Sequence, residues 1–585
     1  MTEAHHAARA NRPPARVVLD WAEAAVANPI LAYGAILVLQ LRVIWNVWRY
    51  KDLTPGDTSF YFLDAAGWTH GLHDNVIYYP LYTDIWGTLH AVLGDVYASG
   101  MVNRVGIIFA ATGLMLAVMR SLLGPAMGLL IVVWWVLLPP NFNLVYDVHL
   151  FGLLPMLIAV LVVARRPGRE AMGIALATLA AGAVLARNEL ILGALIVAVA
   201  ILFREFRARG EDRTTIWVYL RAYGLPLVIA FLLVGAAYWR SHIQGHDVQA
   251  FLRAKHTTNL CEAYAVNYQQ RHPTRFLGNP FTGCAPLMQH DFGRPMPTFF
   301  QATSANPRAM AGFVAWNGRL MESGLQLGLF GATATGDNPT YFPVQNHRSY
   351  ALVLSVILLG AMLAGLVLVI REREQWLREW PRRGPAIIVL SAVAATSLFV
   401  ALTQRPQPDY MYGLIVGVMA LAGVCTAALL RQLRGYSVLA AFAVGLTAVL
   451  ILALPSYYGS GPRPLRDGVK RLRVVRSALQ RPGSVLIAGD NPDGTSLCNY
   501  LAYDFTRACR SITWSALTTQ VSARESLAQV LASSRASAIY AEGPVENDPT
   551  LLRLLAPSQR FGWRQIATGS GSGGPWRILV PVRGG

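Results

Sequence analysis

Apolar segments of nearly membrane-spanning length recur through most of the chain, and this feature most limits its fold. A helix needs about 20 mostly apolar residues to cross the hydrocarbon core of a bilayer. Only 14% of the 585 residues are charged, whereas a soluble domain carries about a quarter. We count about 11 such segments between residues 29 and 455. The sequence therefore predicts a polytopic α-helical membrane protein with about 11 transmembrane helices.

The basic residues lie mainly in short connections between these segments. Two of the clusters are ARRPGRE at 164–170 and REREQWLREWPRR at 371–383. All the strongly basic connections fall on one side of the predicted bundle, which the positive-inside rule makes the cytoplasmic side. That rule accounts for the net charge of +18 without a nucleic-acid partner. We expect a multi-pass protein of the cell membrane, the inner membrane in a bacterium, with a cytoplasmic N-terminus and an extracytoplasmic C-terminus.

The crossings leave two long polar regions, both predicted to lie outside the cytoplasm. The predicted parts are a cytoplasmic N-terminus (1–28), an N-terminal membrane module (29–237) with a catalytic outer loop (48–101), a large extracytoplasmic loop (238–348), C-terminal membrane helices (349–455) and an extracytoplasmic α/β domain (456–585). In the last part, residues 484–489, 537–543 and 576–582 have the composition of short buried strands. Residues 518–533 have the periodicity of an amphipathic helix.

Four of the five cysteines form two local pairs in the two outer regions. Disulfides form in oxidising compartments, and close pairs in outer segments favour them. The alternative is that all four are free thiols. Their spacings do not resemble those of a structural zinc site. We predict two disulfides, Cys261–Cys284 and Cys498–Cys509.

The outer loop after the first apolar segment combines acids, histidines and aromatic rings between residues 56 and 84. Its acids are Asp57, Asp64, Asp74 and Asp84, and its tyrosines include Tyr61 and Tyr79. One interpretation is a solvated loop whose rings lie in the interfacial aromatic belt. The other is a binding site for a polar, ring-shaped substrate beside the membrane.

A second set of ionisable residues lies at the outer ends of later apolar segments. Such residues are costly near a bilayer and are often functional, although a single arginine at a helix end can extend to the lipid headgroups. Because several of them fall on one predicted face, we interpret them together as a site. They are Asp147, His149, Arg187, Glu189, Arg405, Asp409 and Tyr410.

These residues meet the demands of transfer from a lipid-linked sugar. The donor phosphate needs arginine or lysine to hold it, and cations stabilise the charge that develops on it as the glycosidic bond breaks. A carboxylate must orient or deprotonate the acceptor. Asp57, Arg187, Arg405 and the tyrosines of the first outer loop can supply these parts.

The first outer loop also carries a family resemblance. The order of residue types in this loop resembles that of the GT-C superfamily of integral-membrane glycosyltransferases. An acid follows the first span, and after it come an aromatic residue, small residues, a glycine, a tyrosine and a proline. The resemblance is strongest to the branch of protein O-mannosyltransferases and lipid A aminoarabinose transferases. It rests on Asp57, Tyr61, Ala65, Gly71, Tyr79 and Pro80, on the span from Asn103 to Arg120, and on the turn Ala186–Leu190.

The resemblance implies a donor, a base and an inverting transfer. In that family an acid of the first outer loop is the catalytic base and the donor is a polyprenyl-phosphate sugar, so Asp57 is the predicted base. Many members have a second acid beside the first, whereas Thr58 follows here; this leaves Asp64 or Asp84 as the partner of Asp57, and a divalent cation stays an open alternative. The remaining predicted substrate contacts are Tyr61, Asp64, Tyr79, Asp84, Asp147, His149, Glu189 and Tyr410.

Two other functions stay open. A polymerase or ligase of lipid-linked glycans also has one large outer loop, but lacks an acidic loop directly after the first span. A transporter or lipid flippase would more typically show inverted repeats and interrupted helices. The acceptor, which is a glycan, a lipid or a protein, would be recognised by residues 456–585 or by 238–348.

Overall fold

The computed structural model describes residues 14–54, 56–69, 80–143, 146–208, 216–243, 248–276, 279–281, 283–339, 348–432, 436–459, 467–478, 485–488, 492–501, 510–513, 536–542, 549, 563–571 and 574–582. The chain divides into two compact units. One, here the membrane unit, comprises Met1–Ile44 and Gly106–Tyr457. The other, here the sheet unit, comprises Trp45–Val105 and Tyr458–Gly585.

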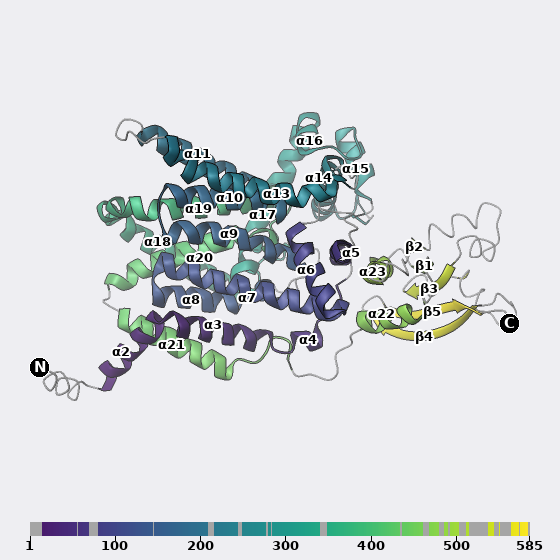
Figure 1. Cartoon of the computed structure of the whole chain (residues 1–585), viewed down its shortest axis with the longest axis horizontal. Helices are drawn as coiled ribbons and strands as arrows, with labels where there is room; N and C mark the ends of the chain where they lie inside the picture. The colour runs from purple at the N-terminus through teal and green to yellow at the C-terminus, as the bar shows by residue number, and fades with distance from the viewer. Residues whose placement is uncertain are drawn as a thin grey trace, which may run out of the picture. The chain divides into compact units, whose positions relative to one another are not determined.

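Long apolar helices dominate the membrane unit (Figure 1). Its helices are α2 (Pro14–Ala27), α3 (Pro29–Ile44), α7 (Val96–Leu123, whose first turns belong to the sheet unit), α8 (Pro125–Val136), α9 (Asp147–Arg165), α10 (Arg169–Leu185), α11 (Leu190–Ala208), α12 (Ile216–Tyr219), the π-helix η2 (Leu220–Gly224), α13 (Leu225–Ile243), α18 (Ser349–Arg371), α19 (Arg373–Thr403), α20 (Tyr412–Gln432) and α21 (Tyr436–Ala453). Short 3-10 turns, η1 (Pro139–Asn141) and η3 (Pro408–Tyr410), precede α9 and α20.

Seven helical segments among the described residues are long and apolar enough to cross a membrane. They are Pro29–Tyr50, Val96–Leu123, Asp147–Arg165, Ile216–Ala237, Ser349–Arg371, Leu377–Thr403 and Tyr412–Arg431. Two shorter apolar helices, Pro125–Val136 and Ser437–Ala453, and helices α10 and α11 also lie between residues 29 and 455, where the crossings are predicted. The chain is thus multi-pass, while the count of about 11 crossings stays a prediction.

The large polar loop of the membrane unit folds into helices α14 (Val248–Arg271), α15 (Cys284–Phe292), α16 (Phe299–Ala305) and α17 (Pro307–Phe330). Side chains cap the N-terminal ends of α16 and α17. Thr298 and Gln301 form a reciprocal capping box at the start of α16, and the Asn306 side chain accepts from the Ala309 N–H at the start of α17. Caps of this kind satisfy N–H groups that have no partner within the helix.

The core of this helical region is aromatic and covalently fixed. Phe292 and Phe313 pack against Tyr264, with ring centroids 5.0 and 5.7 Å away. Beside them Cys261 and Cys284 form a disulfide, one of the two predicted pairs. Cys498 is also disulfide-bonded, and its predicted partner Cys509 lies outside the described residues.

The sheet unit contains a mixed five-stranded sheet. Its strands are β1 (Val485–Ala488), β2 (Arg510–Thr513), β3 (Ala536–Glu542), β4 (Trp563–Gly571) and β5 (Gly574–Pro581), in the order β2-β1-β3-β5-β4. Strand β1 is parallel to β2 and β3, and β5 is antiparallel to β3 and β4. Strands β1, β3 and β5 match the three predicted strands. The predicted helix 518–533 lies outside the described residues.

The same unit includes the first outer loop as α4 (Val47–Tyr50), α5 (Asp57–Thr69) and α6 (Pro80–Leu93), together with α22 (Asp467–Ala478) and α23 (Pro492–Leu501). Helices α5 and α6 pack closely because Gly87 has no side chain: a Cβ there would overlap the carbonyl oxygen of Ala65. Phe62 is fully buried and lies against Trp86 and His90, with centroids 5.4 and 5.0 Å away. Helices α5 and α6 of the outer loop therefore pack against each other around a core of their own.

We predict that the Cys261–Cys284 disulfide stabilises α14 and α15. Its ends are 23 residues apart, and closing a loop of that size restricts the unfolded chain by about 3 kcal/mol. Replacing both cysteines with serine should reduce hydrogen-exchange protection in these two helices. Reductant should reproduce the effect in the wild type and add nothing there in the variant; equal protection in all samples would contradict the prediction.

Candidate functional site

Arg187 is buried at the turn between α10 and α11. Its backbone N–H donates to the carbonyl of Gly182 at 2.8 Å, and its carbonyl accepts from the Leu190 N–H at 3.1 Å, which closes the turn. The side chain is 5% exposed and lies against Gly152 of α9, where a Cβ would overlap its Cγ and Cδ atoms. Gly152 therefore leaves the space through which this guanidinium reaches its partners.

Arg187 joins α9, the α10–α11 turn and η3. It forms an ion pair with Glu189 and donates to Nδ1 of His149. The other ring nitrogen of His149, Nε2, is 3.6 Å from a carboxylate oxygen of Asp409. The Tyr410 ring stacks edge-on against His149 at 5.0 Å and lies 5.5 Å from the Arg187 guanidinium carbon. Side chains from three separate segments thus meet in one polar cluster.

Arg405 completes the cluster from the connection between α19 and α20. The Asn317 side chain of α17 donates to the carbonyls of Leu402 and Gln404 at 2.9 and 3.1 Å. These bonds fix the backbone of the residues that directly precede Arg405. Arg405 itself is 1% exposed. Both guanidinium groups, of Arg187 and Arg405, interact electrostatically with Asp409.

Burial shifts the pKa values of two residues in the connection between α19 and α20, Arg405 and Asp409. It lowers the pKa of Arg405 to about 9, against smaller opposing effects of Tyr410, Asp409 and Glu262. Burial also raises the pKa of Asp409, although Arg187 and Arg405 oppose the change. At neutral pH Arg405 therefore keeps its charge.

Most of the residues predicted for the later spans are brought together here. Asp147 begins α9, is buried, and with Arg187 and Asp409 acts electrostatically on Tyr412. The Tyr412 hydroxyl donates to the carbonyl of Pro140, which ties the start of α20 to η1. We call the set the polar cluster; its members are Asp147, His149, Arg187, Glu189, Arg405, Asp409 and Tyr410.

The structure also shows neighbours that the sequence did not reveal. Lys255 of α14 acts electrostatically on His149, and Glu262 of the same helix acts on Arg405. They lie in a long polar loop with no motif, so no sequence signal linked them to the later spans. Gly152 does follow His149 by three residues, a spacing that places both on one helix face.

The candidates of the first outer loop belong to the sheet unit. Asp57 begins α5 with an exposed side chain, whereas Tyr61 and Asp64 of the same helix are 4% and 6% exposed. Asp84 lies on α6 and is partly exposed. Tyr79 lies outside the described residues. Within the residues that are described, no group of three or more histidine, cysteine or acidic side chains is arranged to hold a metal ion.

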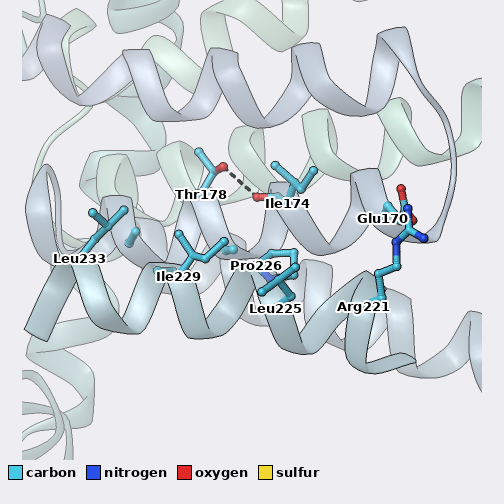
Figure 2. Close-up of a pocket in the computed structure, with 11 residues that line it drawn as sticks. Glu170, Ile174, Thr178, Arg221, Leu225, Pro226, Ile229 and Leu233 are labelled. Atoms are coloured by element: carbon cyan, nitrogen blue, oxygen red, sulfur yellow. Dashed lines mark hydrogen bonds and ion pairs between the residues drawn. The ribbon is translucent and has the colours of Figure 1, made fainter. Parts of the chain in front are cut away.

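A separate groove of about 390 Å³ runs between α10 and α13 (Figure 2). Apolar side chains such as Ile174, Ile229 and Leu233 line it, and Glu170 and Arg221 lie at the end opposite Leu233. These two charged groups pair with each other at 3.0 Å and are largely exposed. The groove has no set of converging polar groups, so the polar cluster is the better candidate for chemistry.

Comparison with known proteins finds similar chains among solved structures. No protein-family model matches the sequence, and no curated protein matches it. Among solved structures it is similar to the oligosaccharyltransferase of Archaeoglobus fulgidus tethered with an acceptor peptide, with a TM-score of 0.44 and 13% identity over 89% of this chain and 69% of that one. It is also similar to ArnT of Cupriavidus metallidurans bound to undecaprenyl phosphate, with a TM-score of 0.39 and 12% identity over 94% and 97%.

We predict that Gly152→Ala displaces Arg187. The added methyl group would overlap the middle of a buried side chain, and such overpacking costs about 1–3 kcal/mol. The matched control is Gly113→Ala in α7, where a Cβ meets nothing within 4 Å and alanine favours the helix. Thermal unfolding in detergent should show a lower midpoint for Gly152→Ala alone. Equal midpoints for the two variants would mean that Arg187 does not depend on this space.

Proposed function

We propose that the chain is a membrane glycosyltransferase of the GT-C type. It would transfer a sugar from a polyprenyl-phosphate-linked donor to an extracytoplasmic glycan, lipid or protein, in an inverting displacement with Asp57 as the base. The observation that carries the proposal is the pair of buried arginines, Arg187 and Arg405, which act on the same carboxylate at the ends of apolar helices.

Two buried guanidinium groups in one cluster are suited to an anionic ligand. Removing a cation from water is expensive unless hydrogen bonds and opposite charges replace its hydration. Glu189 pairs with Arg187, and both arginines act electrostatically on Asp409. Two fixed guanidinium groups held in one cluster can also bind an anionic substrate. A phosphate suits it because guanidinium groups present a planar fork of donors.

The placement at helix ends suits a lipid-linked phosphate in particular. Asp147 and His149 lie in the first turn of α9, and Arg405 and Asp409 lie between α19 and α20. A polyprenyl phosphate has its headgroup at this depth and its hydrocarbon tail among the apolar helices. As its bond to the sugar breaks, charge develops on the phosphate oxygens, and fixed cations stabilise that charge.

Asp57 is the proposed base because its carboxylate is accessible. It is exposed at the start of α5, whereas Asp64 of the same helix is buried. A base must come within hydrogen-bond distance of the acceptor proton, and an exposed carboxylate on an ordered helix can do so. The substrate contacts predicted for the tyrosines and for Asp84 stay part of this proposal.

We predict that Arg405→Ala and Arg187→Ala each weaken donor binding by roughly 10- to 100-fold, because hydrogen bonds to charged groups contribute about 1.5–3 kcal/mol. The lysine variants should weaken it less, since they keep the charge and lose the planar fork. The control is Arg371→Ala at the end of α18, an exposed arginine. Binding can be followed by titration with a polyprenyl-phosphate donor. Wild-type affinity in both alanine variants would exclude these residues as phosphate ligands.

We predict that Asp57→Asn leaves expression and donor affinity unchanged and lowers the rate of transfer by about a hundredfold or more, because the amide cannot accept the acceptor proton. Single-turnover transfer to the natural acceptor measures this. Asp95→Asn is the matched control, since Asp95 is an exposed acid directly before α7 with no proposed role in the site. Wild-type transfer by Asp57→Asn would remove Asp57 from the role and move the assignment to another acid.

A further inference from the structure

Helix α23 of the C-terminal region contacts the start of α5 through three side chains. The Ser496 hydroxyl accepts from the Gly56 N–H at 2.9 Å, directly before Asp57. The Asn499 amide donates to the hydroxyl of Ser59 at 3.0 Å, two residues after it. The Tyr500 hydroxyl donates to the carbonyl of Thr54 at 2.5 Å. Asp57 is thus bracketed by contacts on both sides along the chain.

Two further contacts extend this bracket. The Tyr500 ring packs on Phe62, with centroids 5.6 Å apart, one turn beyond Asp57 on α5. The Asp52 carboxylate accepts from the N–H groups of Gly468 and Val469 at 2.7 and 3.1 Å, where α22 begins. Carboxylates at a helix N-terminus are favoured because the first N–H groups lack partners within the helix.

The contacts set the direction in which Asp57 points. Thr58 and Ser59 are 7% and 0% exposed, so the face of α5 that meets the rest of the sheet unit is filled. Asp57 is exposed and is therefore left on the open side. A catalytic group displaced by about 1 Å can lose a hundredfold in rate, so a base at the first residue of a helix needs a firm backbone.

We propose that the C-terminal region is a clamp that positions the proposed base: Ser496, Asn499 and Tyr500 of α23 hold the first turn of α5 and thereby orient Asp57. The inference rests on the proposed function of Asp57. It differs from the expectation that residues 456–585 only recognise the acceptor, because it makes a C-terminal region necessary for the chemical step itself.

The test uses full-length variants in which single substitutions each remove one contact between α23 and the start of α5. Tyr500→Phe removes one hydroxyl and keeps the ring on Phe62, and Ser496→Ala removes the acceptor of the Gly56 N–H. The matched control is Thr568→Ala, which removes an exposed hydroxyl from β4. Two quantities are measured for each chain: hydrogen exchange of the amides of residues 56–69, and kcat and KM for transfer from a polyprenyl-phosphate donor.

We expect the double variant Ser496→Ala/Tyr500→Phe to exchange these amides about tenfold faster, because opening of the first turn of α5 no longer breaks these bonds. Its kcat should fall about tenfold with the donor KM unchanged, whereas the control matches the wild type in both measurements. A purely structural role would leave kcat unchanged at a temperature where the variant is folded, and that result overturns the proposal.

The two measurements separate the clamp from the proposed function. Unchanged exchange in the double variant overturns the clamp, whatever the activity. Faster exchange with normal kcat also overturns it, because Asp57 then does not depend on the contacts. If the wild type transfers no sugar from any lipid-linked donor, the proposed function is refuted. Faster exchange in the double variant would then still show that α23 holds α5.

Discussion

The burial of charge at the ends of apolar helices is the constraint on which the membrane unit depends. Arg187 and Arg405 are both nearly inaccessible, and each must find its partners within the protein because lipid offers none. Meeting that demand joins segments that are far apart in the sequence. The first turn of α9, the α10–α11 turn and η3 converge on the two guanidinium groups, and α17 supports the backbone beside Arg405.

This arrangement also explains why small residues and amides matter beside the charges. Gly152 gives Arg187 its path, and Asn317 satisfies two carbonyls where α19 ends. Neither residue carries charge, yet each determines where a charged group lies. Breaking such support leaves a buried cation without partners, which costs more than the lost contact alone.

The sequence predicted the charges of the site more successfully than their surroundings. Arg187 and Arg405 were recognisable because each interrupts or ends an apolar run, where an ionisable residue is expensive. Lys255 and Glu262 were not recognisable, because a polar loop gives no register against the membrane helices. The sheet shows the same limit: β1, β3 and β5 are inner, apolar strands, whereas β2 and β4 are the edges. Edge strands are half solvated and need no apolar pattern.

The contact between Gly56 and Ser496 spans 440 residues of sequence, which has a consequence for how the protein matures. During synthesis the helix that begins at Asp57 emerges long before its partners do. At 5–20 residues per second, roughly 20 to 90 s separate the two. Throughout that interval the apolar segments of the membrane unit that follow α3 are made and inserted. The order of synthesis therefore delays completion of the Asp57 helix until the chain is nearly finished, so a prematurely terminated chain would reach the membrane without a fully assembled pair of helices α5 and α6.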